Sequence, residues 1–167
     1  MYSKIKVFGH PLHPMLIPFP VAFYTGALVR YIVYSSNHDP FWFKMGYVVN
    51  LAGIIMAALA ALPGFIDWLN IPSDSKAKRT GFLHLAANVS ALFLYAMCFY
   101  TVKDKWNDVA PAVGNTVKLT ATGFILTLVA GFLGWTLVQK DHVGVDDITP
   151  DEKEIGLRMN TNADNYS

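Results

Sequence analysis

The sequence predicts an all-α integral membrane protein, an antiparallel four-helix bundle with a short polar C-terminal tail. Four apolar stretches are each long enough to cross the hydrocarbon core of a bilayer, which takes roughly 20 helical residues. Apolar residues make up 53% of the 167-residue chain and charged residues only 15%, against about 25% in a typical soluble domain. This deficit of charge favours lipid as the surroundings of the chain.

The first two apolar stretches are bounded by signals that start and stop helices. Residues 15–35 follow Pro14, which suits the first turn of a helix because its missing N–H is not needed there. The turn at 35–40 separates them from residues 41–69, which contain a dense run of Ala, Leu and Ile. Both stretches should be helices, because backbone polar groups in lipid must find partners within their own segment.

The third and fourth stretches, residues 81–101 and 119–138, are joined by a polar loop over 103–115. Short connections make consecutive helices antiparallel, which predicts a four-helix bundle. No internal repeat is expected. The chain is therefore divided into an extended N-terminal segment (1–14), a four-helix transmembrane domain (15–140) and an acidic soluble tail (141–167).

The expected location is the inner (cytoplasmic) membrane of a bacterium. We call the face that should hold both termini side A and the opposite face side B. Side A has six Lys or Arg residues close to the membrane and side B has five. Six against five does not decide orientation by the positive-inside rule. We expect side A, with the N- and C-termini, to be cytoplasmic because no signal or long translocated domain precedes the first helix. The net charge of +1 and the absence of a basic helix exclude nucleic acid as a partner.

Four of the five histidines are predicted to meet on side A. His10 and His13 precede the first helix, His84 opens the third, and His142 follows the fourth. Histidine is scarce at membrane depth unless it pairs, relays protons or holds a cofactor. A proline after each of the first two histidines restricts its backbone to extended conformations, so we expect a stiff segment at the mouth of the helix.

Two further polar residues are expected near these histidines. Asp67 lies inside the second stretch at its side A end, where a carboxylate costs energy unless it is paired. It can pair with Lys78 or Arg79, or receive the ring N–H of a ligating histidine. Asn88 lies one helical turn after His84 on the same face and can orient the groups bound there.

Two cofactor chemistries fit these residues. A haem b takes two axial imidazoles from facing helices, and we predict His13 and His84, with His10 and His142 as alternates. A compact zinc, iron or copper ion held by three or four of these imidazoles with Asp67 is the alternative. The aromatic residues expected to wall a haem are Phe8, Phe19, Phe65, Trp68, Phe82 and Trp135.

The leading hypothesis is therefore a haem b-binding or metal-binding membrane protein that transfers electrons or serves as a subunit of a membrane redox complex. The same histidines also fit a cofactor-free structural or assembly subunit packed against other membrane proteins. A metal-dependent membrane enzyme or sensor is a third hypothesis. Catalysis is not indicated, because the sequence has no nucleophile elbow, phosphate-binding loop or zinc-protease helix.

The opening Gly-His-Pro-Leu-His-Pro at 9–14 resembles that of domain-of-unknown-function family 2231, four-helix membrane proteins of bacteria. The resemblance spans residues 8–145 and takes in 64–69, His84 and 142–145. It implies the four-helix membrane fold. It also implies a redox setting, because some family members are fused to Rieske-type iron–sulfur domains. The chain departs from the family at Pro18, where a histidine more often precedes Phe-Pro, so the first helix offers no third imidazole.

Overall fold

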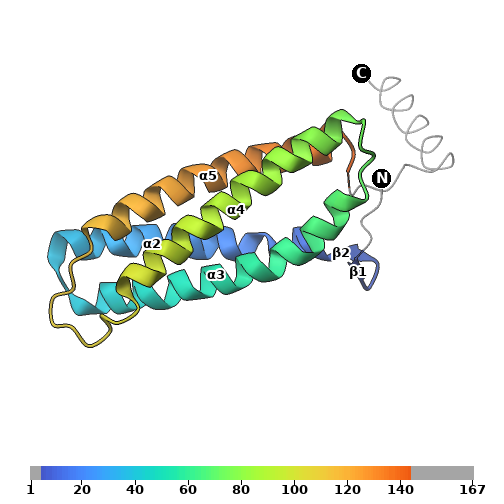
Figure 1. Ribbon diagram of the computed structural model, residues 1–167. Coiled ribbons are helices and arrows are strands. Elements are labelled where there is room, and N and C mark those ends of the chain that lie inside the picture. The colour runs from blue at the N-terminus through green and yellow to red at the C-terminus, as the bar shows by residue number, and fades with distance from the viewer. Residues whose placement is uncertain (1–4, 144–167) are drawn as a thin grey trace, which may run out of the picture.

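The computed structural model describes residues 5–143, which contain four long helices running back and forth through one bundle (Figure 1). These helices are α2 (Pro18–Asn37), α3 (Pro40–Leu69), α4 (Lys76–Val102) and α5 (Gly114–Gln139). Strands β1 (Lys6–Val7) and β2 (His10–Pro11) and the short helix α1 (Leu12–Leu16) precede them. Each of the four is long and apolar enough to span a membrane, which confirms the predicted fold class.

Two of the long helices begin earlier than the apolar stretches that predicted them. Helix α4 begins at Lys76 instead of 81, because the Ser75 side chain accepts a hydrogen bond from the backbone N–H of Lys78. Helix α5 begins at Gly114 instead of 119. Hydrophobicity marks the apolar part of a helix, and the Ser75 cap extends α4 beyond it, whereas α5 begins without a side-chain cap.

The N-terminal segment is helical from Leu12 onward, so the expected extended conformation through residue 14 does not hold at His13. Pro14 is tolerated because it lies in the first turn of α1, where its N–H would have no partner in any case. Before it, β1 and β2 pair in an antiparallel hairpin with Val7 opposite His10. Phe8, at the turn of this hairpin, is 98% exposed and does not wall an internal site.

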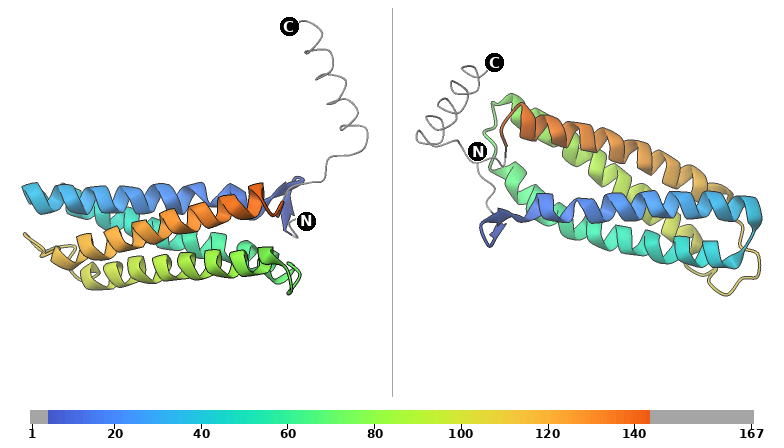
Figure 2. Two further views of the ribbon diagram at one scale, coloured as in Figure 1. Left: turned by 90° about the horizontal axis from the view of Figure 1, so that it is seen from above. Right: turned by 180° about the vertical axis from the view of Figure 1, so that it is seen from behind.

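The bundle consists of two helical hairpins packed side by side (Figure 2). Helix α2 packs along α3, and α4 packs along α5. Further contacts join α3 to α4 and α2 to α5, which leaves α2 and α4 facing each other across the diagonal. The entry to α1, the connection from α3 to α4 and the end of α5 lie at one end of the bundle, which is side A.

The two hairpins are related by an approximate twofold axis that runs along the bundle. Tyr24 of α2 and Tyr95 of α4 stack across the diagonal, with ring centres 3.6 Å apart and planes at 1°. Each ring also packs on a glycine of its own hairpin, Gly53 or Gly123. Both hairpins leave side A and return to it, so the repeat is of the parallel type found in some membrane proteins.

Burial follows the same relation. Four buried positions of α2 become buried positions of α4 when 71 is added to their numbers, and four of α3 become buried positions of α5 when 70 is added. The pairs are Pro20 and Ala91, Tyr24 and Tyr95, Ala27 and Cys98, Tyr31 and Val102, Gly46 and Thr116, Asn50 and Thr120, Gly53 and Gly123, and Ala60 and Ala130. Burial and ring contacts therefore correct the expectation of no repeat. The sequence does not show the repeat, because few of the paired residues are identical.

Gly53→Ala and Gly123→Ala should each destabilise the bundle by about 1–3 kcal/mol, the usual cost of overpacking a core. A Cβ at Gly53 would lie 2.8 Å from the Tyr24 ring, and one at Gly123 would lie 2.7 Å from the Tyr95 ring. Thermal unfolding in detergent measures the loss. Gly131→Ala is the matched control, since a Cβ there meets nothing within 4 Å. Equal tolerance of all three substitutions would contradict the packing described.

Candidate functional site

His13 and His84 meet inside the side A end of the bundle. Their ring centres lie 6.2 Å apart, and the ring planes are nearly perpendicular at 88°. His13 comes from α1, at the entry to the first hairpin, and His84 comes from α4, in the second hairpin. The structure thus brings together the two histidines that were predicted as an axial pair.

Each imidazole is anchored by a backbone carbonyl of its own hairpin. His13 Nδ1 lies 2.8 Å from the carbonyl oxygen of Ala60, and His84 Nδ1 lies 2.8 Å from that of Ala130. A carbonyl oxygen can only accept a hydrogen bond, so Nδ1 carries the proton and donates in both rings. In the neutral imidazole, Nε2 is then the nitrogen with a lone pair available to a ligand.

A glycine one helical turn after each carbonyl makes room for the ring. A Cβ at Gly64 would lie 2.6 Å from Cε1 of His13, and a Cβ at Gly134 would lie 3.0 Å from Cε1 of His84. The Ala-x-x-x-Gly spacing is the same in α3 and α5, and 11 residues separate each histidine from the tyrosine of its hairpin. These shared spacings were the sequence signal for the carbonyl and glycine partners, which the sequence reasoning missed.

Asn88 breaks the equivalence of the two rings. Its Nδ2 lies 3.1 Å from Nε2 of His84 and 2.9 Å from the backbone oxygen of the same residue. Because Nδ1 of His84 holds the proton, the Asn88 amide donates to Nε2. The twofold-equivalent position is Ile17, whose side chain has no donor. Asn88 therefore contacts Nε2 of His84, the nitrogen expected to bind a metal. This agrees with its predicted position near the site.

His10 and His142 lie at the same end of the bundle but outside the pair. Both side chains are exposed, His10 on β2 and His142 after the end of α5. Within residues 5–143, no three His, Cys, Asp or Glu side chains are arranged to hold a metal ion. A compact ion site built from three or four imidazoles and Asp67 is therefore not assembled in this part of the chain.

The side A end of α3 is closed by a lysine. Lys78 Nζ donates to the carbonyl oxygens of Trp68 at 2.8 Å and Leu69 at 3.3 Å, and it lies 4.1 Å from the centre of the Trp68 ring. A cation is favourable there because carbonyls at the end of a helix carry partial negative charge. Asp67, in the last turn of α3, is half-buried next to this cap.

The aromatic residues expected to wall a haem lie mostly on the outside of the bundle. Phe65 stacks on Trp68 with ring centres 5.7 Å apart, and Phe82 contacts the same Trp68 ring at 6.2 Å. The exposed fractions of four of the expected residues are between 44% and 54%: Phe19, Phe65, Phe82 and Trp135. These four side chains therefore lie on the outer surface of the bundle.

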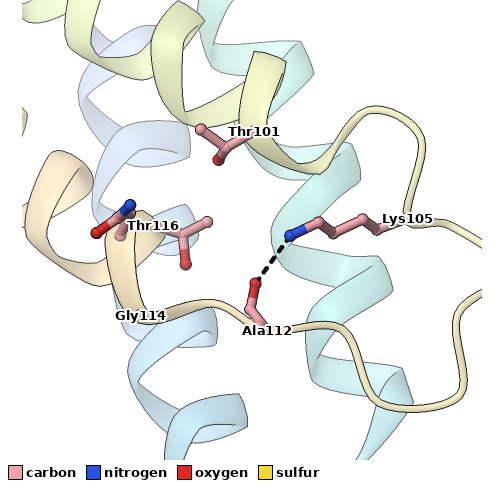
Figure 3. A pocket seen from close by; sticks show the side chains of 6 residues that line it. Thr101, Lys105, Ala112, Gly114 and Thr116 are labelled. Atoms are coloured by element: carbon pink, nitrogen blue, oxygen red, sulfur yellow. Dashed lines mark hydrogen bonds between the residues drawn. The ribbon is translucent and has the colours of Figure 1, made fainter.

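A small hollow of about 240 Å³ lies at side B, at the opposite end of the bundle from the His13–His84 pair, between the end of α4 and the start of α5 (Figure 3). Lys105 Nζ donates to the carbonyl oxygen of Ala112 at 3.2 Å across it. Thr116, which lines it, donates to the carbonyl oxygen of Val113 at 2.6 Å. These polar groups hold the loop together, and no predicted site residue lies there.

Residues 9–147 match a family model described as "Predicted membrane protein (DUF2231)". The chain belongs to the DUF2231 family. The matched region of this DUF2231 protein includes both histidines of the pair, their carbonyl and glycine partners, and the tyrosine stack. The resemblance inferred from the Gly-His-Pro-Leu-His-Pro opening is thereby confirmed. No curated protein and no solved structure matches the chain.

His13→Ala and His84→Ala should each lower the free energy of unfolding by about 1–3 kcal/mol. Each substitution removes a 2.8 Å hydrogen bond to a carbonyl and leaves the space over a glycine empty. Thermal unfolding in detergent is again the measurement. His10→Ala serves as the control, because the exposed His10 side chain should change stability by less than about 0.5 kcal/mol. A loss as small for His84→Ala as for His10→Ala would argue against the anchoring.

Proposed function

We propose that this DUF2231 protein holds a redox-active metal centre between His13 and His84, with haem b as the first candidate. It would serve as an electron-transfer component, or as a subunit of a larger membrane redox complex. The observation that carries the proposal is the convergence of two imidazoles from diagonal helices, each with Nδ1 donating to a carbonyl. Metal-ligating histidines almost always donate their other ring N–H to a carbonyl, a carboxylate or water.

The spacing of the two rings supports a single metal atom as the ligand. Metal–nitrogen bonds of about 2.0–2.1 Å on either side of one metal place the imidazole centres roughly 6 Å apart. The centres of His13 and His84 are 6.2 Å apart. A twofold arrangement also favours a ligand that takes two equivalent imidazoles, as the iron of a b-type haem does.

The chain's own residues would orient the ligand nitrogens and limit the access of other groups. The carbonyls of Ala60 and Ala130 fix the tautomer and the ring direction, so Nε2 of both histidines is the coordinating atom. The hydrogen bond from Asn88 to Nε2 of His84 would have to break before that nitrogen could bind a metal. The Asn88 amide could then keep its second hydrogen bond, to the backbone oxygen of His84. A haem or metal ion held there would supply one-electron chemistry.

A cofactor-free structural or assembly subunit is the second candidate, and one observation favours it. Both ring nitrogens of His84 already have partners, Ala130 on one side and Asn88 on the other. In that case the two imidazoles only join neighbouring helices by hydrogen bonds to backbone carbonyls. Large apolar side chains on the outer surface of the bundle would then contact other membrane subunits as well as lipid.

The spectrum of the protein purified in detergent from haem-replete cells separates these candidates. We expect a Soret band that shifts on reduction with dithionite, and its loss in both His13→Ala and His84→Ala. His10→Ala and His142→Ala should retain the band, because both side chains are exposed away from the pair. A colourless wild-type protein with stoichiometric metal would favour an ion. A colourless protein without metal would overturn the redox proposal and leave the structural subunit.

We further propose that the protein lies in the inner membrane of a bacterium with side A in the cytoplasm, in line with the small excess of Lys and Arg on that side. Green fluorescent protein fused after residue 167 should fluoresce, and alkaline phosphatase fused there should be inactive. Alkaline phosphatase inserted in the loop over 103–115 is the matched control and should be active. The reverse pattern would invert the proposed orientation.

A further inference from the structure

The two halves of the twofold core differ in how they satisfy their buried polar groups. In the second half, the Tyr95 hydroxyl contacts the carbonyl oxygens of Tyr24 at 3.3 Å and Thr120 at 3.1 Å. The Thr120 hydroxyl donates to the carbonyl oxygen of Thr116 at 2.7 Å. In the first half, the Tyr24 hydroxyl is buried and completes no hydrogen bond within the part of the chain that the structure describes.

Asn50 is the origin of this difference, because it stands where the second half has Thr120. Its Nδ2 donates to the carbonyl oxygen of Tyr95 at 3.3 Å. By the twofold relation, that oxygen is the counterpart of the Tyr24 carbonyl, which accepts from the Tyr95 hydroxyl. The acceptor that the Tyr24 hydroxyl would use by symmetry thus receives the Asn50 amide instead. Asn50 Oδ1 is itself buried and accepts no hydrogen bond from residues 5–143.

Two further polar side chains lie near Asn50: Tyr31 on α2 and Cys98 on α4. Tyr31 lies within interaction range of the Asn50 amide and the Cys98 thiol. Its hydroxyl nevertheless completes no hydrogen bond of good geometry among the described residues. The twofold-equivalent positions of Tyr31 and Cys98 are Val102 and Ala27, whose side chains are apolar. The polar region therefore belongs to one side of the axis only.

We call Tyr24, Tyr31, Asn50 and Cys98 the Asn50 cluster. All four residues are at most 3% exposed, and they lie on helices long and apolar enough to span a membrane. The cluster extends toward side B, where Cys98 lies four residues before the end of α4. Within residues 5–143, three of their polar atoms complete no hydrogen bond of good geometry: the hydroxyls of Tyr24 and Tyr31, and Oδ1 of Asn50. Unpaired polar groups are costly in lipid, because no bulk water can reach them and the helices provide no spare donors.

We propose that the Asn50 cluster is a binding site for internal water within the helical bundle. A buried water typically makes about three hydrogen bonds to polar groups that would otherwise be unsatisfied. The cluster offers that number, with two hydroxyls that donate or accept and one amide oxygen that accepts. It has no carboxylate, so a neutral hydrogen-bonding molecule fits it better than a cation. This inference does not depend on the histidine pair or on any cofactor.

Water-edited solid-state NMR of the wild-type protein in lipid bilayers tests the proposal directly. Polarisation from water should build up on the Asn50 side-chain amide several-fold faster than on Val102 or Ala27, which are equally buried but belong to the apolar side of the axis. Build-up on Asn50 as slow as on those two residues would overturn the proposal, since the amide would then be dry.

The single cysteine gives a second measurement that needs no assignment of peaks. The infrared S–H stretching band of Cys98 should lie at the wavenumber of a hydrogen-bonded thiol. Tyr24→Phe should shift it, because this removes a hydroxyl that holds the water. The matched control carries Ala27→Cys together with Cys98→Ala, which moves the thiol to the twofold-equivalent, apolar position. A Cys98 band at the same position as the control band, unchanged by Tyr24→Phe, would count against a hydrated cluster.

Discussion

Contact between a ring and a glycine on the neighbouring helix is the interaction on which this bundle depends. Four of these contacts form two twofold-related pairs: His13 on Gly64 with His84 on Gly134, and Tyr24 on Gly53 with Tyr95 on Gly123. Tyr31 also lies on Gly46, and Trp68 lies on Gly81. Lipid tails are as apolar as the side chains, so the hydrophobic effect does not drive membrane helices together. Close packing and hydrogen bonds to backbone carbonyls must do so, and each ring of the two pairs provides the close approach for one hairpin.

The approximate twofold axis explains why two histidines converge and two do not. A group near the axis meets its counterpart from the other hairpin, as His13 meets His84 and Tyr24 meets Tyr95. His10 and His142 have no histidine at their equivalent positions, which are occupied by Gly81 and Pro72. A site made by symmetry therefore has two imidazoles and not four. The ligand proposed here is accordingly one that takes two equivalent imidazoles.

Departures from the twofold pattern are as informative as the pattern. Asn88 places an amide on one imidazole only, because its counterpart is Ile17. Asn50 takes the carbonyl of Tyr95 and leaves polar atoms on one side of the core without partners. The unpaired atoms of the Asn50 cluster are costly in a low-dielectric interior unless a bound molecule uses them, which is the basis of the water site proposed there. Asn88 is exposed and its amide already donates to His84, so it carries no such cost.

The sequence by itself determined the four membrane spans, their antiparallel order and the gathering of four histidines toward one face. These are local properties, since they follow from the length of apolar stretches and the shortness of the connections between them. The contact of Asn88 with His84 is local too, because residues four apart share a helix face. The helical state of His13 was missed, because the proline after it was read as enforcing extended backbone.

Only the tertiary structure decided which histidines meet and what holds them. His13 bonds to Ala60 and His84 to Ala130, partners 47 and 46 residues away in the chain. Such contacts depend on how a side chain fits the groove of another helix, and that fit leaves no periodic signal in hydrophobicity. The repeat was hidden for the same reason. Equivalent positions are buried in both hairpins although their residue types differ, as with Tyr31 and Val102.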